Sequence, residues 1–237
     1  DSPMLVRSKM TPDVITASPD TSLADALKLT RGNRIRHLPV VENGRLVGLV
    51  TDRDLRLAMP PVWASDTDHA ELREALNTRR VDSVMTTEIV TITGDKPIED
   101  AARELYEHRI GCLPVMEGDE LVGIITETDL LRAFVELFGA DQSGTRIEIR
   151  MQDKPGELSR VVRAIGVDFK LNINGIVIPR VGNERIAVVH LATNQPDAII
   201  AHLRRLGYHV GSPSLDFEDE HAHVTPAPIR HWAAEGF

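Results

Sequence analysis

The sequence predicts a mixed α/β (α+β) fold: two copies of one βαββα unit, followed by a smaller βαββαβ unit. The first observation is a repeat, because residues 10–58 return at residues 85–133 with a constant offset of 75 and 19 identities over 49 positions. Background residue frequencies would give about three identities. The second observation is a change of pattern after Gly144, where apolar residues begin to alternate along the chain. We therefore expect a pseudo-two-fold pair and a separate third unit.

Composition argues against several classes of protein. With 237 residues, 42% of them hydrophobic, the chain can bury a core and form two or more domains. The net charge of −9 and an aromatic content of 4% provide neither a basic stripe nor a stacking platform for nucleic acid. No apolar run of about 18 residues suits a membrane, and residues 1–10 lack the apolar segment of a secretion signal. The single cysteine, Cys112, fits a reducing cytoplasm.

The first copy predicts its elements in a clear order. A short apolar stretch at 14–16 predicts a strand, and a helix capped at 21–22 follows it. Two β-branched runs, 37–41 and 46–51, flank a polar turn and predict a hairpin. A second helix is expected to start after Thr51.

The second copy repeats this order. Residues 89–92 predict its strand, Pro97 lies in the first turn of its first helix, and its second helix starts after Thr126. Between the copies, residues 60–80 predict a linker that contains an extra amphipathic helix.

Both copies carry a Thr-x-x-Asp motif where the second helix begins: Thr51 with Asp54, and Thr126 with Asp129. One interpretation is a helix N-cap, in which threonine accepts from first-turn amides and aspartate complements the helix dipole. The other is a binding site, because a strand-to-helix turn presents N–H groups to phosphate and the carboxylate can accept from both hydroxyls of a ribose. The two interpretations are compatible.

These motifs, with the Leu-Pro-Val before them and the Met-Thr that opens each copy, resemble the CBS domain, which occurs in tandem pairs (Bateman modules). The resemblance spans residues 6–135 and places the two domains at 4–59 and 81–140. It implies a regulatory module whose clefts bind adenosine-containing ligands such as AMP, ADP, ATP or S-adenosylmethionine. No further cofactor is implied.

The same resemblance implies binding residues in both copies. The threonine and aspartate of each motif would hold the ribose and adjoining phosphate, the strand backbone would contact the adenine edge, and the Leu-Pro segment would line the base pocket. With the polar positions beside them, the implied residues are Ile15, Thr16, Ala17, Arg36, His37, Leu38, Pro39, Thr51, Arg53, Asp54, Val90, Thr91, Ile92, Gly111, Cys112, Leu113, Pro114, Thr126, Thr128 and Asp129.

The two copies differ in charge near these motifs. Arg36, His37 and Arg53 of the first copy are donors suited to phosphate oxygens. The equivalent positions of the second copy are Gly111, Cys112 and Thr128. If each copy supplies its own phosphate ligands, the first site prefers nucleotides, and the second takes nucleosides or nothing. Two alternatives stay open: phosphate ligands lent across the pseudo-two-fold axis, or arginines that form a solvated face.

Residues 144–210 predict a ferredoxin-like sheet with helices on one face. Strands are expected at 145–151, 172–178, 185–192 and 208–210. The first helix is expected to end at Gly166, and the second to be capped by Asn194 and to end before Gly207.

The first strand-to-helix turn of this unit, residues 153–158, resembles the ACT domain. The order of a CBS pair followed by an ACT domain resembles proteins of the acetoin-utilisation AcuB type. ACT domains commonly bind amino acids or other small molecules at the interface between paired copies; the alternative is a unit that only dimerises. The implied contacts are Asp153, Pro155, Gly156, Glu157, Leu158, Asn172 and Asn174.

The sequence predicts neither a catalytic nor a metal site. Cys112 and His37 occupy equivalent positions of the two copies rather than a converging pair, and Cys112 is expected to be small apolar filler. The tail, residues 211–237, is expected to be flexible, and its His221-x-His223 pair has no third ligand fixed in space.

We therefore expect an allosteric sensor rather than an enzyme. A small-molecule effector in the CBS pair, and a metabolite in the ACT domain, would bias each other by about 1–3 kcal/mol. The chain is expected to form a homodimer and to regulate an enzyme partner, with a link to acetoin utilisation. The rival hypotheses are a ligand-free scaffold or partner-binding subunit of a metabolic enzyme, and an enzyme whose active site forms only in an oligomer.

Overall fold

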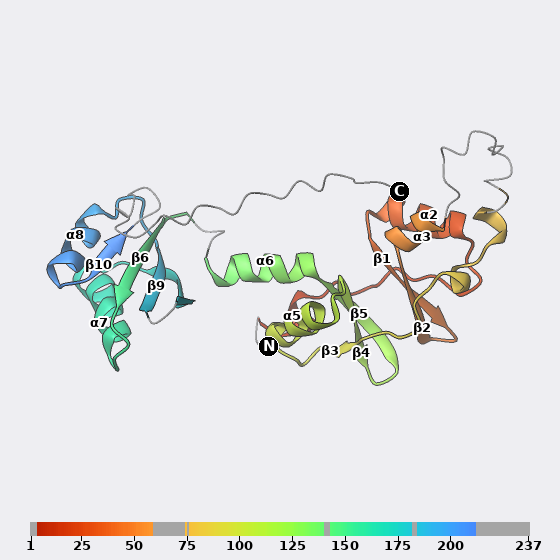
Figure 1. Ribbon diagram of the computed structural model, residues 1–237, viewed down its shortest axis with the longest axis horizontal. Helices are drawn as coiled ribbons and strands as arrows, with labels where there is room; N and C mark the ends of the chain where they lie inside the picture. The colour runs from red at the N-terminus through yellow and green to blue at the C-terminus, as the bar shows by residue number, and fades with distance from the viewer. Residues whose placement is uncertain (1–3, 59–73, 75, 140–142, 182–183, 212–237) are drawn as a thin grey trace, which may run out of the picture. The chain divides into compact units, whose positions relative to one another are not determined.

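The computed structural model describes residues 4–58, 74, 76–139, 143–181 and 184–211. These residues belong to two compact units, 1–134 and 135–237 (Figure 1). Apart from Gly211, the predicted tail lies outside the described residues, as does most of the predicted linker helix. In the part that the structure describes, no helix is long and apolar enough to cross a membrane.

The first copy has the predicted helix, hairpin and helix. Helix α2 (Leu23–Asn33) begins after Ser22, whose hydroxyl accepts from the Asp25 amide at 3.1 Å. Strands β1 (His37–Glu42) and β2 (Arg45–Thr51) pair antiparallel across a turn in which both central residues have positive φ. Asparagine followed by glycine is the residue pair that this kind of hairpin turn favours. Helix α3 (Asp52–Leu57) follows directly.

The second copy repeats these elements with the expected offset. They are α5 (Ile98–His108), β4 (Cys112–Glu117), β5 (Glu120–Thr126) and α6 (Glu127–Leu137). Pro97 was predicted to lie in the first turn of its helix, but it is the N-cap residue, and the helix begins at Ile98. Each copy has its own apolar core, which contains Leu38 in the first copy and Leu113 in the second, both fully buried.

The prediction of a strand before the first helix is wrong for the first copy, and in the second copy the strand is shorter than predicted. Residues 14–16 form no strand, and only Ala17 makes a bridge, to Val40. In the second copy only β3 (Ile92–Thr93) pairs, in parallel with β4. The physical reason lies upstream, because Thr11 is paired with the other copy and residues 12–16 cross from one copy to the other.

The two copies exchange backbone hydrogen bonds at equivalent positions. Thr11 and Ile124 bond each other through N–H and C=O at 2.9 and 3.0 Å, and Thr86 and Leu49 do the same at 2.8 and 2.9 Å. Thr11 is equivalent to Thr86, and Leu49 to Ile124, at the offset of 75, so the contact has the predicted pseudo-two-fold symmetry.

The copies also exchange core side chains. Val6, on the short helix α1 (Val6–Lys9), is fully buried in the core of the second copy. Its equivalent, Val81, on the 3₁₀ turn η1 (Val81–Ser83), is fully buried in the core of the first. Each copy is thus completed by the segment that precedes the other copy in sequence.

The second unit has the predicted βαββαβ order. Its elements are β6 (Thr145–Met151), α7 (Glu157–Arg163), β7 (Ile173–Val177), β8 (Arg180–Val181), β9 (Glu184–Leu191), α8 (Asp197–Arg205) and β10 (His209–Gly211). The antiparallel sheet has the order β10-β6-β9-β7, and the short β8 pairs with β9. Ile147 and Ile149 of β6 point with β9 residues toward the buried side chains of both helices.

Two helix ends of this unit differ from the sequence expectation. Gly166 does not end the first helix, because a π-helical turn, η2 (Ala164–Asp168), continues it and buries Ile165. Pro196, rather than Asn194, is the N-cap of α8, and it has no side chain that could make a capping bond. Both differences reflect tertiary packing, which outweighs a local end signal.

Candidate functional site

The first unit contains a cleft where the two copies meet, here called the inner cleft, with a volume of about 250 Å³. Both copies contribute to it, each through its hairpin region, and the second copy adds its opening segment. The residues that line it are His37, Leu49, Thr51, Asp54, Thr86, Glu88, Ile89, Val90, Arg109, Ile110, Gly111 and Cys112. It therefore combines the first Thr-x-x-Asp motif with apolar side chains from the other copy.

Thr51 and Asp54 form a capping box at the start of α3. The Thr51 amide and hydroxyl both donate to Asp54 Oδ2, at 3.0 and 2.6 Å, and the Asp54 amide donates to Thr51 Oγ1 at 3.2 Å. Thr126 and Asp129 make the same three bonds at 2.9, 2.7 and 3.4 Å. The capping interpretation of the motif is confirmed in both copies, and it fixes one carboxylate oxygen while the side chain of Asp54 lines the cleft.

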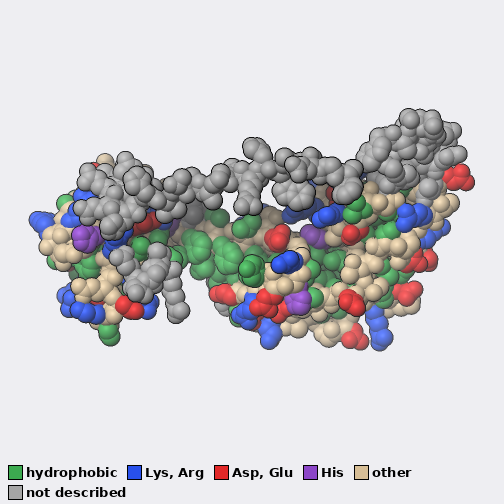
Figure 2. All heavy atoms as spheres, in the orientation of Figure 1, with side chains coloured by type: hydrophobic (Ala, Val, Ile, Leu, Met, Phe, Trp, Pro, Cys, Tyr) green, Lys and Arg blue, Asp and Glu red, His purple; other side chains and the backbone are tan. Residues whose placement is uncertain are grey.

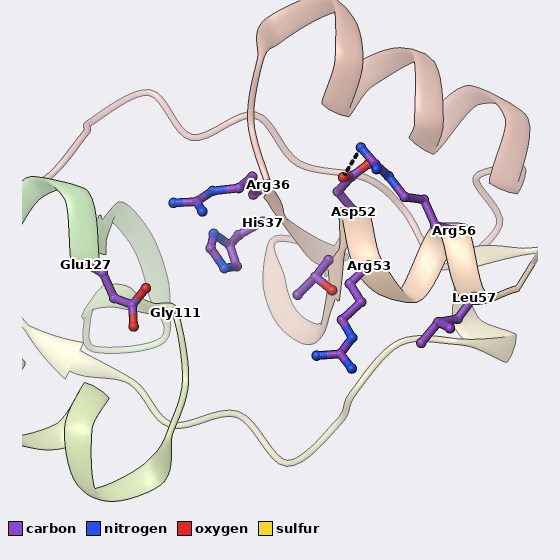
Figure 3. A pocket seen from close by; sticks show the side chains of 9 residues that line it. Arg36, His37, Asp52, Arg53, Arg56, Leu57, Gly111 and Glu127 are labelled. Carbon is purple, nitrogen blue, oxygen red and sulfur yellow. Dashed lines mark ion pairs between the residues drawn. The ribbon is translucent and has the colours of Figure 1, made fainter. Parts of the chain in front are cut away.

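A second, wider hollow adjoins the inner cleft and is called the outer cleft; its volume is about 550 Å³. It is lined by Arg36, His37, Thr51, Asp52, Arg53, Arg56, Leu57, Gly111 and Glu127. Figure 3 shows Arg36 and His37 directed toward the helix that begins at Glu127, with Arg53 on the same side of α3. The two clefts share His37, Thr51 and Gly111 in their walls, so they lie next to each other.

The arginines of the outer cleft differ in the partners that they contact. Arg56 turns back to Asp52, with an Nη2–Oδ2 distance of 2.7 Å (Figure 3). Arg36 donates across the copies to Thr128 Oγ1 at 3.3 Å. Arg53 is exposed, and Glu127 stands on the facing wall. A ligand entering here meets two guanidinium groups that no carboxylate is seen to neutralise among the described residues.

His37 lies between the two clefts and packs closely against Gly111. A Cβ atom on Gly111 would lie 2.8 Å from His37 Nε2, so the glycine leaves room for the imidazole. Burial lowers the pKa of His37 and Arg36 lowers it further, whereas Glu127 and Asp54 act in the opposite direction. The ring is therefore neutral near pH 7 and can donate or accept one hydrogen bond.

Eight of the predicted nucleotide residues line the two clefts, whereas residues 15–17, 91 and 92 and the second Thr-x-x-Asp motif with Thr128 belong to neither lining. Arg36, His37, Thr51, Arg53 and Asp54 line the clefts together with Val90, Gly111 and Cys112. The Leu-Pro segments lie in the cores, and Cys112 is 2% exposed. Burial raises the pKa of its thiol to about 12, so the thiol is not a nucleophile at neutral pH.

Several cleft residues were not predicted from sequence. These are Leu49, Asp52, Arg56, Leu57, Thr86, Glu88, Ile89, Arg109, Ile110 and Glu127. The missing signal was the exchange between the copies, which brings residues 86–90 to the motif of the first copy. Arg56 and Glu127 could have been found, because Arg56 lies two residues after Asp54 and Glu127 directly follows Thr126.

The second unit contains a hollow of its own, here called the basic cavity, with a volume of about 700 Å³. It is lined by Arg150, Met151, Gln152, Lys154, Pro155, Glu157, Arg160, Leu206, Gly207, Tyr208 and His209. Two predicted ACT contacts, Pro155 and Glu157, thus line it. The predicted Asn172 and Asn174 belong to the β7 edge, which the sheet order separates from β10, and Asn174 donates to the Ser143 carbonyl at 3.4 Å.

The remaining predicted contacts of that turn have other roles. Gly156 is the N-cap of α7 with a φ of 90°, which a glycine adopts readily. Asp153 pairs with Arg185 on β9, at 3.0 Å between Oδ1 and Nε. Within the described residues, no group of three or more His, Cys, Asp or Glu side chains is placed to hold a metal ion.

Surface charge is mixed. On the face shown in Figure 2, acidic and basic side chains of the first unit are interspersed and form no continuous basic stripe. The two clefts of this unit thus lie at the seam of a duplicated α+β module.

Comparison with known proteins identifies the duplicated module. The CBS domain matches residues 6–61 and 81–136. A CBS domain-containing protein of Dictyostelium discoideum is 37% identical over 136 residues, which cover 56% of this chain and 93% of that protein. The chain belongs to the CBS domain-containing proteins.

Solved structures match the same share of the chain. A candidate acetoin utilization protein (AcuB) of Vibrio cholerae is 33% identical with a TM-score of 0.47, covering 56% of this chain and 91% of that one. CBSX2 in complex with AMP is 31% identical with a TM-score of 0.46, covering 55% and 96%.

Proposed function

We propose that the CBS pair is a sensor of an adenine nucleotide, with adenosine in the inner cleft and phosphate in the outer cleft. The observation that carries the proposal is the adjacency of the two clefts, which share His37, Thr51 and Gly111 in their walls. One end offers a carboxylate and apolar walls, and the other offers guanidinium groups.

The inner cleft suits a nucleoside. The capping bonds of Asp54 all involve Oδ2 or its own amide, so they leave Oδ1 to accept from ribose hydroxyls. Leu49, Ile89 and Ile110 provide apolar surface for the faces of a base. Because its volume of about 250 Å³ is less than half that of the outer cleft, we assign the nucleoside part to it and the phosphate to the outer cleft.

The outer cleft suits phosphate. Arg36 and Arg53 can form charge-assisted hydrogen bonds to phosphate oxygens, and a neutral His37 can donate one more. S-adenosylmethionine is disfavoured as the ligand of this site, because its sulfonium cation would face the same guanidinium groups. The second Thr-x-x-Asp motif has the cap without these arginines, so we expect any ligand there to be a nucleoside.

The test is calorimetric titration of the full chain with adenosine, AMP, ADP, ATP and S-adenosylmethionine. Asp54→Asn removes the ribose acceptor, and Asp129→Asn is the matched control because it alters the same cap in the other copy. We expect micromolar binding of at least one nucleotide, reduced at least tenfold by Asp54→Asn alone. Absence of binding by all five compounds would favour the ligand-free scaffold.

We also propose that the second unit is an ACT domain that binds a small metabolite in the basic cavity. The βαββαβ order and the Pro155-Gly156 turn beside that cavity support this. In this proposal the chain is a cytoplasmic homodimer that regulates an enzyme partner in acetoin utilisation. Sedimentation velocity at several concentrations tests the dimer, and nucleotide affinity measured with and without the metabolite tests coupling between the units.

A further inference from the structure

The basic cavity lies where three parts of the second unit meet: the turn after β6, the first turns of α7, and the connection from α8 to β10. Its volume of about 700 Å³ falls within the range of small-molecule sites, roughly 300–1,000 Å³. The volume alone therefore admits an amino acid or a larger metabolite. The charges of the lining residues distinguish between these two kinds of ligand.

The lining of the cavity is strongly cationic. Arg150, Lys154 and Arg160 contribute three positive charges, and His209 adds an imidazole. Glu157 is the one carboxylate in the lining. With His209 neutral, the formal sum over these side chains is +2, a large imbalance in a chain whose net charge is −9.

Both oxygens of Glu157 are already engaged. Arg160 Nη1 lies 3.2 Å from Oε1, and the Tyr208 hydroxyl donates to Oε2 at 3.1 Å. The Glu157 side chain is 14% exposed, whereas that of Arg160 is 74% exposed. The pair thus keeps the carboxylate turned inward and leaves the guanidinium group accessible.

This arrangement disfavours a zwitterion. The ammonium group of a bound amino acid needs an acceptor, and Glu157, the one carboxylate in the lining, is only 14% exposed and already accepts from Arg160 and Tyr208. An anion has the opposite requirement, which the cavity meets with guanidinium and ammonium donors. Tyr208 stays a neutral donor, because burial and the adjacent Glu157 raise its pKa.

We infer that the ligand of the basic cavity is a small metabolite with two or more negative charges, either a di- or tricarboxylate or a phosphorylated compound, rather than an amino acid. The inference rests on the proposed function of the second unit as a small-molecule-binding domain and names the class of ligand. Lys154 on the turn side would face one end of the anion, and Arg160 on α7 the other.

The experiment titrates the full chain by calorimetry with succinate, citrate, inorganic phosphate and pyrophosphate, and separately with L-serine and L-isoleucine. We expect at least one anion to bind, and the carboxylate and phosphate arms show which chemistry is preferred. Lys154→Gln should weaken that binding about tenfold or more, the factor that corresponds to 1.4 kcal/mol. Arg163→Gln, which removes a positive charge from α7 outside the lining, should leave it unchanged.

Contrary outcomes are separable. Tighter binding of an amino acid than of every anion, lost in Lys154→Gln, overturns the ligand class and keeps the second unit as a small-molecule domain. Binding of an anion that Lys154→Gln and Arg163→Gln weaken equally overturns the site, because general charge then explains it. No binding by any compound overturns both, while AMP titration of the same sample reports separately on the CBS clefts.

Discussion

The two CBS copies build the same helix cap and surround it differently. In each, the motif threonine hydroxyl donates to aspartate Oδ2, at 2.6 Å in the first copy and 2.7 Å in the second. Four positions beside the first cap are Arg36, His37, Arg53 and Arg56, and their equivalents are Gly111, Cys112, Thr128 and Leu131. The difference shows that the two copies share the residues that fold the unit and differ in the charged side chains beside the cap.

The largest expected effect tests whether the two cores are equivalent. Leu38 and Leu113 are both fully buried, so Leu38→Ala and Leu113→Ala should each lower the free energy of unfolding by about 2–5 kcal/mol. Urea denaturation of the two variants measures both losses. If one variant loses less than about 1 kcal/mol, the two cores are not energetically equivalent.

Exchanging the charged position tests the functional difference. Arg53→Thr gives the first copy the residue of the second, and should weaken AMP binding by roughly 10- to 100-fold, because a hydrogen bond to a charged group contributes about 1.5–3 kcal/mol. Adenosine binding should change little. Calorimetry with both ligands measures this, and Thr128→Arg is the reciprocal variant. Equal losses for AMP and adenosine would show that Arg53 does not contact phosphate.

The caps provide a smaller, symmetric effect on stability. Thr51→Ala and Thr126→Ala each remove a capping hydroxyl and should each lower the free energy of unfolding by about 0.5–2 kcal/mol. Only Thr51→Ala should also weaken nucleotide binding, since Thr51 lines both clefts. Paired denaturation and titration experiments separate the two roles, and equal effects on binding would argue against a single nucleotide site.

The smallest expected effect is a pH dependence that differs in sign between the copies. Burial lowers the pKa of His37 in the folded chain, so the unfolded chain binds more protons and stability falls as the pH drops below the ordinary value of 6.5. The pKa of Cys112, the equivalent residue, is raised from 9.0 to about 12, so stability falls as the pH rises above 9.

Denaturation across pH measures these two slopes. His37→Gln should reduce the loss of stability at acidic pH, and Cys112→Ala should reduce the loss at alkaline pH. Neither variant should change the effect at the other end of the pH range. If a variant has the same pH dependence of stability as the wild-type protein, the substituted group does not cause that dependence.

Much of the fold could be predicted from sequence because local signals agreed with packing. Ser22, the turn at 43–44 and the strand at 145–151 are found where the pattern placed them. The failures at Gly166 and at 14–16 have one cause, since in both places long-range contacts set the conformation. A repeat offset reveals two similar units, and it does not reveal which segment completes which core.

The candidate site was predictable in part for the same reason. Thr51, Asp54 and Arg53 could be named from a local motif, and they line the clefts. Glu88 and Arg109 could not, because they reach the motif of the first copy only through the exchange between copies. The basic cavity was visible in sequence only as a Pro-Gly turn, since Tyr208 and His209 join it through the order of the sheet strands.

The reciprocal burial of Val6 and Val81 has a consequence for cooperativity. Opening either copy withdraws an apolar side chain from the other, so the two are expected to melt in a single transition and neither to persist as an isolated fragment. A ligand bound beside α3 would then also slow hydrogen exchange at amides of the second copy, without any conformational change.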